Sequence, residues 1–147
     1  FKFKSGHETD LTIKLFSIAI SRIRAIQENK HRAVLVPIPA STREKNRIRY
    51  EEFCRKLSAG IGVADGYEAI TLTANRPQLK GTHGQNKTAN LQFQPEYIKD
   101  KCVLLIDDLL TTGEGFIQTK RRLIEHGAKF VIGLFLAKTI AFEDEQE

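Results

Sequence analysis

The sequence has no methionine, no tryptophan and only two cysteines in 147 residues. Cys54 and Cys102 lie too far apart in the chain to form the CxxC pair that is typical of structural zinc sites. One disulfide between them remains possible. So few cysteines nevertheless favour a reducing compartment, and we expect a cytoplasmic protein. No apolar run approaches the ~20 residues of a transmembrane helix, which argues against a membrane protein.

The composition and the charge distribution narrow the class of protein further. Apolar residues make up 41% and charged residues 28% of the chain, as in globular proteins. The length suits one domain spanning residues 1–147, with a frayed acidic tail at 143–147. The net charge of +5 is uneven, because residues 1–60 hold 13 of the 23 Lys and Arg but only 6 of the 18 Asp and Glu. An anionic partner such as phosphate or nucleic acid would suit this half, and so would a solvated basic surface.

Apolar periodicity predicts three helices, at 11–28, 47–59 and 115–126. In the middle one, Phe53 and Leu57 are expected to point inward. The inward positions of the first are expected to be Leu11, Leu15, Phe16, Ile18, Ala19, Ile23 and Ile26. Those of the third are expected to be Phe116, Ile117, Leu123 and Ile124, with His126 and Gly127 ending the helix.

Short continuous apolar runs predict strands at 33–38, 67–72, 102–106 and 129–137. Helices alternating with nearly continuous apolar strands predict an α/β fold whose central sheet is mainly parallel and flanked by helices. Ligands of such sheets bind beyond the carboxyl ends of the strands.

The longest polar stretch, residues 73–95, predicts a flexible loop.

The stretch VLLIDDLLTTGEG, residues 103–115, places Asp107 and Asp108 where a buried strand is expected to end. Adjacent carboxylates repel each other, and a vicinal diol, with Mg²⁺ nearby, would satisfy both. Thr111 and Thr112 add hydroxyl groups, and Gly113 and the residues after it lead into a helix whose free N–H groups can bind an anion. A pocket for a sugar phosphate explains the aspartates and the glycine-rich segment together. The alternative is a capped turn with two solvated aspartates, which would explain either feature on its own but not their combination.

This stretch resembles the phosphoribosyl pyrophosphate (PRPP) signature of type I phosphoribosyltransferases. The resemblance implies a phosphoribosyltransferase fold, a Mg²⁺ cofactor held indirectly through Asp107 and Asp108, and PRPP or a nucleotide containing ribose 5-phosphate as the ligand. It implies that the two aspartates hold the ribose hydroxyls. The residues around the 5-phosphate would be Thr111, Thr112, Gly113, Glu114 and Gly115. Gly115 stands where the signature usually has a hydroxyl residue, so one hydrogen bond to phosphate is expected to be lost.

The resemblance extends to two further segments, most closely in the competence-protein-F branch of the family. The segment PIPAS (37–41) after the first buried strand is similar to a pyrophosphate loop, formed here by Ala40, Ser41, Thr42 and Arg43. Arg76 and Lys87 in the polar stretch match basic positions of that branch and are the remaining catalytic candidates. The loop 73–95 would then close over the site and exclude water.

Two functions from different classes stay open. One is a Mg²⁺-dependent phosphoribosyltransferase that releases pyrophosphate. The other is a non-catalytic module that senses PRPP or nucleotides, or that acts in DNA uptake with a nucleic acid as its partner. The retained acid pair favours the enzyme, the basic first 60 residues favour the module, and a homodimer is left open.

Overall fold

The computed structural model describes residues 9–73, 88–107 and 113–135. The helices are α1 (Thr9–Ser21), α2 (Arg24–Glu28), α3 (Arg43–Asn46), α4 (Glu52–Ile61), α5 (Pro95–Ile98) and α6 (Glu114–Glu125). The strands are β1 (Ala33–Pro37), β2 (Ala64–Asp65), β3 (Ile70–Leu72), β4 (Leu91–Phe93), β5 (Cys102–Asp107) and β6 (Phe130–Phe135). Short 3₁₀ turns cover Lys30–Arg32 and Tyr67–Ala69, and a π-helical turn, Arg47–Glu51, joins α3 to α4.

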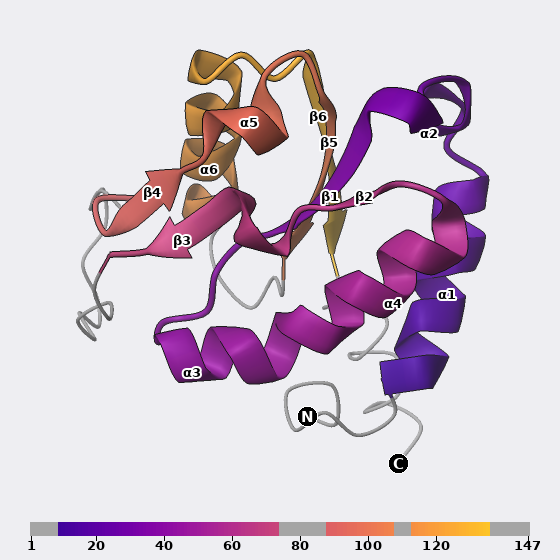
Figure 1. The fold of residues 1–147 in the computed structure, drawn as a ribbon, viewed down its shortest axis with the longest axis horizontal. Coiled ribbons are helices and arrows are strands. Elements are labelled where there is room, and N and C mark those ends of the chain that lie inside the picture. Colours follow the sequence, from indigo (N-terminus) through magenta and orange to yellow (C-terminus); the bar gives the residue numbers. More distant parts are fainter. Residues whose placement is uncertain (1–8, 74–87, 108–112, 136–147) are drawn as a thin grey trace.

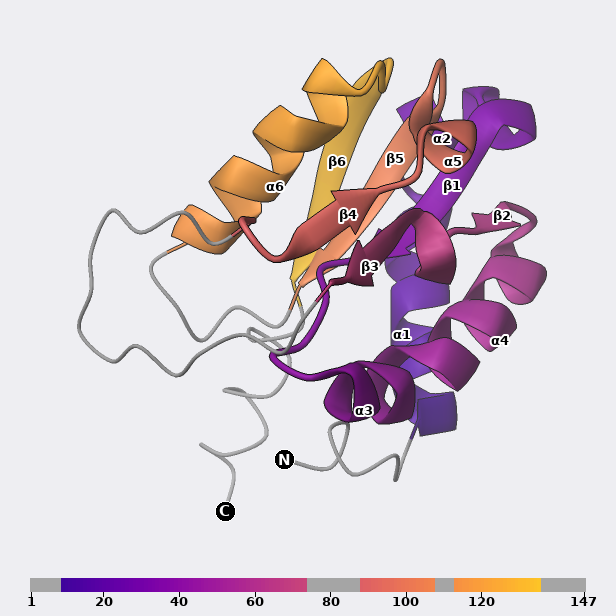
Figure 2. The same cartoon turned by 60° about the vertical axis from the view of Figure 1, so that its left-hand side comes forward.

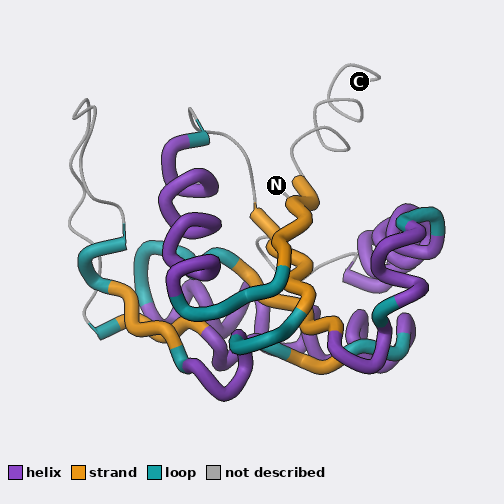
Figure 3. The backbone as a smooth tube through the Cα atoms, turned by 90° about the horizontal axis from the view of Figure 1, so that it is seen from above, coloured by secondary structure: helices purple, strands orange, loops and turns teal. Residues whose placement is uncertain are grey.

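Four strands form a parallel sheet in the order β2-β1-β5-β6. β1 and β5 pair along their lengths, from Ala33 opposite Cys102 to Pro37 opposite Ile106. Helices pack on both faces of this sheet, which explains why its central strands are apolar on both sides (Figure 3). The α/β prediction, with a parallel sheet flanked by helices, is confirmed.

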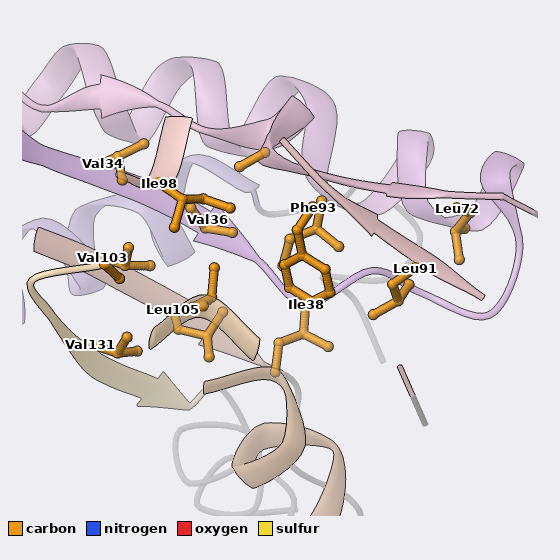
Figure 4. Close-up of a cluster of buried hydrophobic side chains, with 14 residues drawn as sticks. Val34, Val36, Ile38, Leu72, Leu91, Phe93, Ile98, Val103, Leu105 and Val131 are labelled. Carbon is orange, nitrogen blue, oxygen red and sulfur yellow. The ribbon is translucent and has the colours of Figure 1, made fainter. Parts of the chain in front are cut away.

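The side chains of β1 and β5 alternate between two hydrophobic clusters. Ala33 and Leu35 join α1, α2 and α4 on one face, whereas Val34 and Val36 face the other side. There they meet Val103 and Leu105 of β5, together with residues from β3, β4, α5 and α6 (Figure 4). Figure 1 shows α4 and α1 on one side of the sheet and α6 on the other.

A separate antiparallel pair, β3 with β4, lies against the second cluster (Figure 2). Ile70 is opposite Phe93, and Leu72 is opposite Leu91. The predicted strand at 67–72 is therefore wrong in its first half, which is a 3₁₀ turn, and it does not join the main sheet. The predicted loop 73–95 is wrong at 91–93, where the two apolar residues of LQF are buried.

The first predicted helix, 11–28, is two helices, because the chain turns between Ser21 and Arg24. Its predicted inner face is also partly wrong. Phe16 is buried and packs edge-on against Phe53 at 5.7 Å, but Leu11, Leu15 and Ile18 are 48%, 42% and 46% exposed. Ala19 is exposed as well, and Ile20, which the prediction omitted, is fully buried.

The predicted helix at 115–126 is confirmed as α6, and Leu123 is fully buried. Ile117 and Ile124 were expected inward but are 55% and 46% exposed. The last strand starts one residue later than predicted, at Phe130, and residues 136 and 137 of the prediction lie outside the described part of the chain. Of the described residues of β6 only Val131 is buried, because β6 is the final strand of the described sheet.

The two cysteines are free and buried, so the disulfide that the sequence allowed between them does not form. Both belong to the cluster that contains α1 and α4.

Among the described helices, none has both the length and the apolar character needed to cross a bilayer.

Candidate functional site

The direction of the chain connections reverses between β1 and β5, which is where open α/β sheets are expected to have a ligand crevice. From β1 the chain passes through α3 and α4 outward to β2, and from β5 it passes through α6 outward to β6 in the opposite direction. Such a reversal opens a gap at the carboxyl ends of the two central strands, where open α/β sheets bind their ligands. Figures 1 and 2 both show α3 beyond that end of the sheet.

Asp107 is the last residue of β5 and lies at this crevice. It is half-buried and pairs with Phe135 of β6. By alternation along the strand, its side chain shares the face of Val103 and Leu105, which is the face covered by α6 and the β3–β4 pair. The structure thus places one of the two predicted acids at the switch point of the sheet.

The helix that follows begins beside the same crevice. Gly113, with φ of 87° and ψ of −1°, precedes α6, and the first intrahelical bond runs from the Ile117 N–H to the Gly113 carbonyl. The amides of Glu114, Gly115 and Phe116 precede that bond, as N–H groups do in the first turn of any helix. The predicted glycine-rich entry to the helix is confirmed, and only a residue tolerant of positive φ fits at position 113.

Two contacts fix the first turn of α6, and sequence reasoning missed both. The hydroxyl of Thr119, which is 1% exposed, donates to the Gly115 carbonyl at 2.7 Å. The ring of Phe116 packs edge-on against Phe135 at 4.9 Å, above Gly133. The signals were present in the sequence: a threonine four residues after Gly115, and a glycine inside an aromatic strand.

The loop after β1 stays bonded to β5 at its start. The Ile38 amide donates to the Ile106 carbonyl at 2.8 Å, which extends the strand pairing by one residue. Ala40 is buried, and its amide donates to the side-chain oxygen of Asn46 at 3.0 Å. Thr42 caps α3, because its hydroxyl oxygen accepts from the Lys45 amide at 3.1 Å.

Arg43 connects this loop to the β3–β4 pair. Its Nε donates to the Leu72 carbonyl at 3.1 Å, and its Nη2 donates to the Thr73 carbonyl at 2.9 Å. Thr73 in turn donates from its amide and its hydroxyl to the Asn90 carbonyl, at 2.9 and 3.0 Å. Arg43 therefore holds the end of β3 beside the loop after β1.

The remaining predicted site residues lie outside the described part of the chain. These are Arg76, Lys87, Asp108, Thr111 and Thr112. The described ranges contain no group of three or more His, Cys, Asp or Glu that could hold a metal ion. Asp107 supplies the hard oxygen donor that Mg²⁺ prefers, so the described residues fit an indirectly held Mg²⁺.

Neither cysteine has the character of a nucleophile. Burial raises the pKa of the Cys54 thiol well above 9.0, and the nearby charge of Asp65 raises it further. Burial also raises the pKa of Cys102, against the opposing influence of Lys129 and Arg32. Both side chains therefore stay thiols near neutral pH.

No model of a known protein family matches the chain. A search of curated proteins finds similarity to an orotate phosphoribosyltransferase of Pyrococcus horikoshii, with 27% identity over 141 residues. The match covers 92% of this chain and 68% of the relative. Together with the parallel sheet, this similarity supports a type I phosphoribosyltransferase at the level of the family.

Proposed function

We propose that this protein binds PRPP at the crevice between β1 and β5 and transfers its phosphoribosyl group to a nitrogen nucleophile. The observation that carries the proposal is the position of Asp107 and the start of α6 at the two ends of one short connection. This connection leaves the sheet where its strand order reverses, which is where such folds bind ligands. The similarity to a phosphoribosyltransferase is independent support.

The two ends of the connection suit the two ends of a ribose phosphate. Asp107 and Asp108 would accept hydrogen bonds from the ribose hydroxyls. Residues 111–115 would surround the 5-phosphate, with the amides of Glu114 and Gly115 at the positive end of α6. Because Gly115 lacks a hydroxyl, only its backbone would contribute to phosphate binding.

In the transfer, the bond from ribose C1 to a pyrophosphate oxygen breaks while the acceptor nitrogen bonds to C1 and gives up its proton to water. The electron pair leaves with pyrophosphate, and positive charge develops on the sugar, where Asp107 and Asp108 would stabilise it. Mg²⁺ supplies neutralisation of the pyrophosphate charge when it is bound. The loop Ala40–Arg43 would face the pyrophosphate, with exposed Lys45 and Arg47 following it.

Arg76 and Lys87 remain proposed partners of the leaving group on sequence grounds. The name of the relative makes orotate the first acceptor to test. The competence-protein-F branch also remains a proposal, because the comparison that supports the family is with an orotate enzyme.

The test is release of pyrophosphate from PRPP with Mg²⁺, measured with orotate and with a panel of purine and pyrimidine bases. Asp107→Asn removes one charge at the crevice and is expected to slow release by about 10²–10³-fold. The matched control is Asp100→Asn, at the amino end of β5. Asp100 has φ of 60°, a conformation that asparagine tolerates well, so this variant should keep wild-type activity.

Three outcomes separate the readings. Release that is lost in Asp107→Asn and kept in Asp100→Asn supports the enzyme. Calorimetric binding of PRPP without turnover on any base supports the sensing module instead. If millimolar PRPP and ribose 5-phosphate both give no binding heat, the proposed site is wrong.

A further inference from the structure

The loop joining β1 to α3 is tied down by a buried side chain that no motif singles out. Asn46 ends α3 and is 7% exposed. Its side-chain oxygen accepts from the Ala40 amide at 3.0 Å, and its backbone N–H donates to the Thr42 carbonyl at 2.9 Å. Two hydrogen bonds therefore close the segment between Ala40 and Asn46 into a compact ring.

The bond to Ala40 matters because that amide has little access to water. Ala40 is itself only 6% exposed, so an N–H that lost its acceptor there would gain little from solvent. Every peptide bond of the described chain is trans, and in a trans peptide the carbonyl points opposite to the N–H. Turning the Ala40 N–H toward Asn46 thus also fixes the direction of the Pro39 carbonyl.

The ring is anchored on both sides. Before it, the Ile38 amide bonds to the end of β5 at Ile106, and within it Arg43 bonds to the end of β3. These bonds restrain the loop at Ile38, Ala40 and Arg43 without any ligand.

We propose that Asn46 is a positioning residue that shapes the loop Ala40–Arg43 for the pyrophosphate end of PRPP, an inference that rests on the proposed function. Asn46 is buried beneath the loop and acts through the Ala40 amide. Its loss should then weaken binding of the pyrophosphate group more than binding of the ribose phosphate group, which is assigned to the other side of the crevice.

The experiment compares Asn46→Leu, which has no acceptor, with Asn46→Gln, which keeps a neutral amide oxygen as the acceptor. Binding of PRPP, Mg²⁺-pyrophosphate and ribose 5-phosphate is measured by calorimetry for each. Asn46→Leu is expected to weaken PRPP and pyrophosphate about tenfold, the factor typical of one hydrogen bond, and to leave ribose 5-phosphate unchanged. Asn46→Gln should recover part of this loss.

The matched control is Asn29→Leu, near the amino end of the sheet. Asn29 is half-buried, and its side-chain amide donates to the Ala25 carbonyl at 2.7 Å, so it reports general destabilisation. Circular dichroism and a thermal melt check the fold of each variant. If Asn46→Leu does not fold, Asn46→Ser carries the same comparison, because its hydroxyl is too short to replace the acceptor.

Equal weakening of both ligand classes, or unchanged pyrophosphate binding in the variant without an acceptor, would overturn the role of Asn46 and leave the proposed function standing. A wild-type protein that binds ribose 5-phosphate but no pyrophosphate would also overturn this inference alone. A wild-type protein that binds none of the three would overturn the proposed function and the inference together.

Discussion

Replacing Gly133 by alanine should destabilise the protein through the first turn of α6. A Cβ atom at this position in β6 would lie 2.5 and 2.6 Å from two ring carbons of Phe116 and 3.2 Å from the Phe135 ring. Carbon atoms in contact prefer about 3.5–4.0 Å, so the Phe116 ring must retreat by roughly 1 Å. Inserting a methyl into such a packed site typically costs about 1–3 kcal/mol.

Two smaller effects adjust this estimate. If Phe116 swings away instead, its edge-on pair with Phe135 is lost, at a cost of about 0.5–1.5 kcal/mol beyond the buried area. In the other direction, alanine restricts the unfolded chain more than glycine does, which returns about 0.4–1 kcal/mol. The expected net loss in the free energy of unfolding of Gly133→Ala is therefore about 1–2 kcal/mol.

Urea denaturation followed by circular dichroism measures this loss, and Gly60→Ala is the control. Gly60 lies on the exposed side of α4, where an added Cβ meets nothing within 4 Å. Gly60→Ala should therefore raise the free energy of unfolding, by about 0.5–1 kcal/mol. If Gly133→Ala unfolds at the wild-type urea midpoint or above it, the account of how Phe116 fixes the start of α6 is refuted.

Two further expectations follow from burial. Leu123 is fully buried, so Leu123→Ala should lower the free energy of unfolding in urea by about 2–5 kcal/mol. Ile117 is 55% exposed, so Ile117→Ser should change it by less than about 0.5 kcal/mol. The opposite order would mean that the inner face of α6 is assigned wrongly. The raised pKa of Cys54 predicts alkaline sensitivity. The unfolded thiol ionises first, so this contribution to stability is complete below about pH 8.5 and is lost as pH rises, by at most about 1.4 kcal/mol per pH unit. Urea titrations from pH 7 to pH 10 should show a smaller decline for Cys54→Ala than for the wild type, and an identical decline would contradict this explanation.

The sequence was most informative where one local pattern determines the structure. The run at 102–106 is continuously apolar and is followed by two aspartates, which predicted a buried central strand. β5 is that strand. The glycines around 113–115 likewise predicted the start of α6, because positive φ is a property of single residues.

Prediction failed where the outcome depends on a distant partner. β2 is two exposed residues that only their pairing with β1 makes a strand, and β4 is three residues inside a polar stretch. The prediction of which helix faces are buried failed for the same reason. Leu15 and Phe16 fit an apolar stripe equally well, and it is the contact with Phe53 of α4 that decides which of them is buried.

At the candidate site, sequence patterns predicted charged and glycine-rich residues but not the side chains that hold the loop after β1 in place. Asn46 lies between Lys45 and Arg47, and sequence reasoning considered only the charge of this segment. Its role as an acceptor depends on the chain turning back so that Ala40 lies beside it, which residue spacing does not predict. Arg43 matched a loop that binds pyrophosphate, yet in the structure its guanidinium bonds two backbone carbonyls at the end of β3.

The proline at the end of β1, Pro37, removes a backbone N–H donor at a position where the neighbouring strand offers no acceptor. β2 pairs only with Val34 and Leu35 in the described chain, and the Gly66 amide adds one bond to the Leu35 carbonyl. Since the Ile38 amide points toward β5, an amide at position 37 would point to the opposite edge, where β2 has already ended. Position 37 is buried, so any other residue there would bring a donor that needs an acceptor. Proline has no such donor, which lets this strand run deep into the interior beside a neighbour only two residues long.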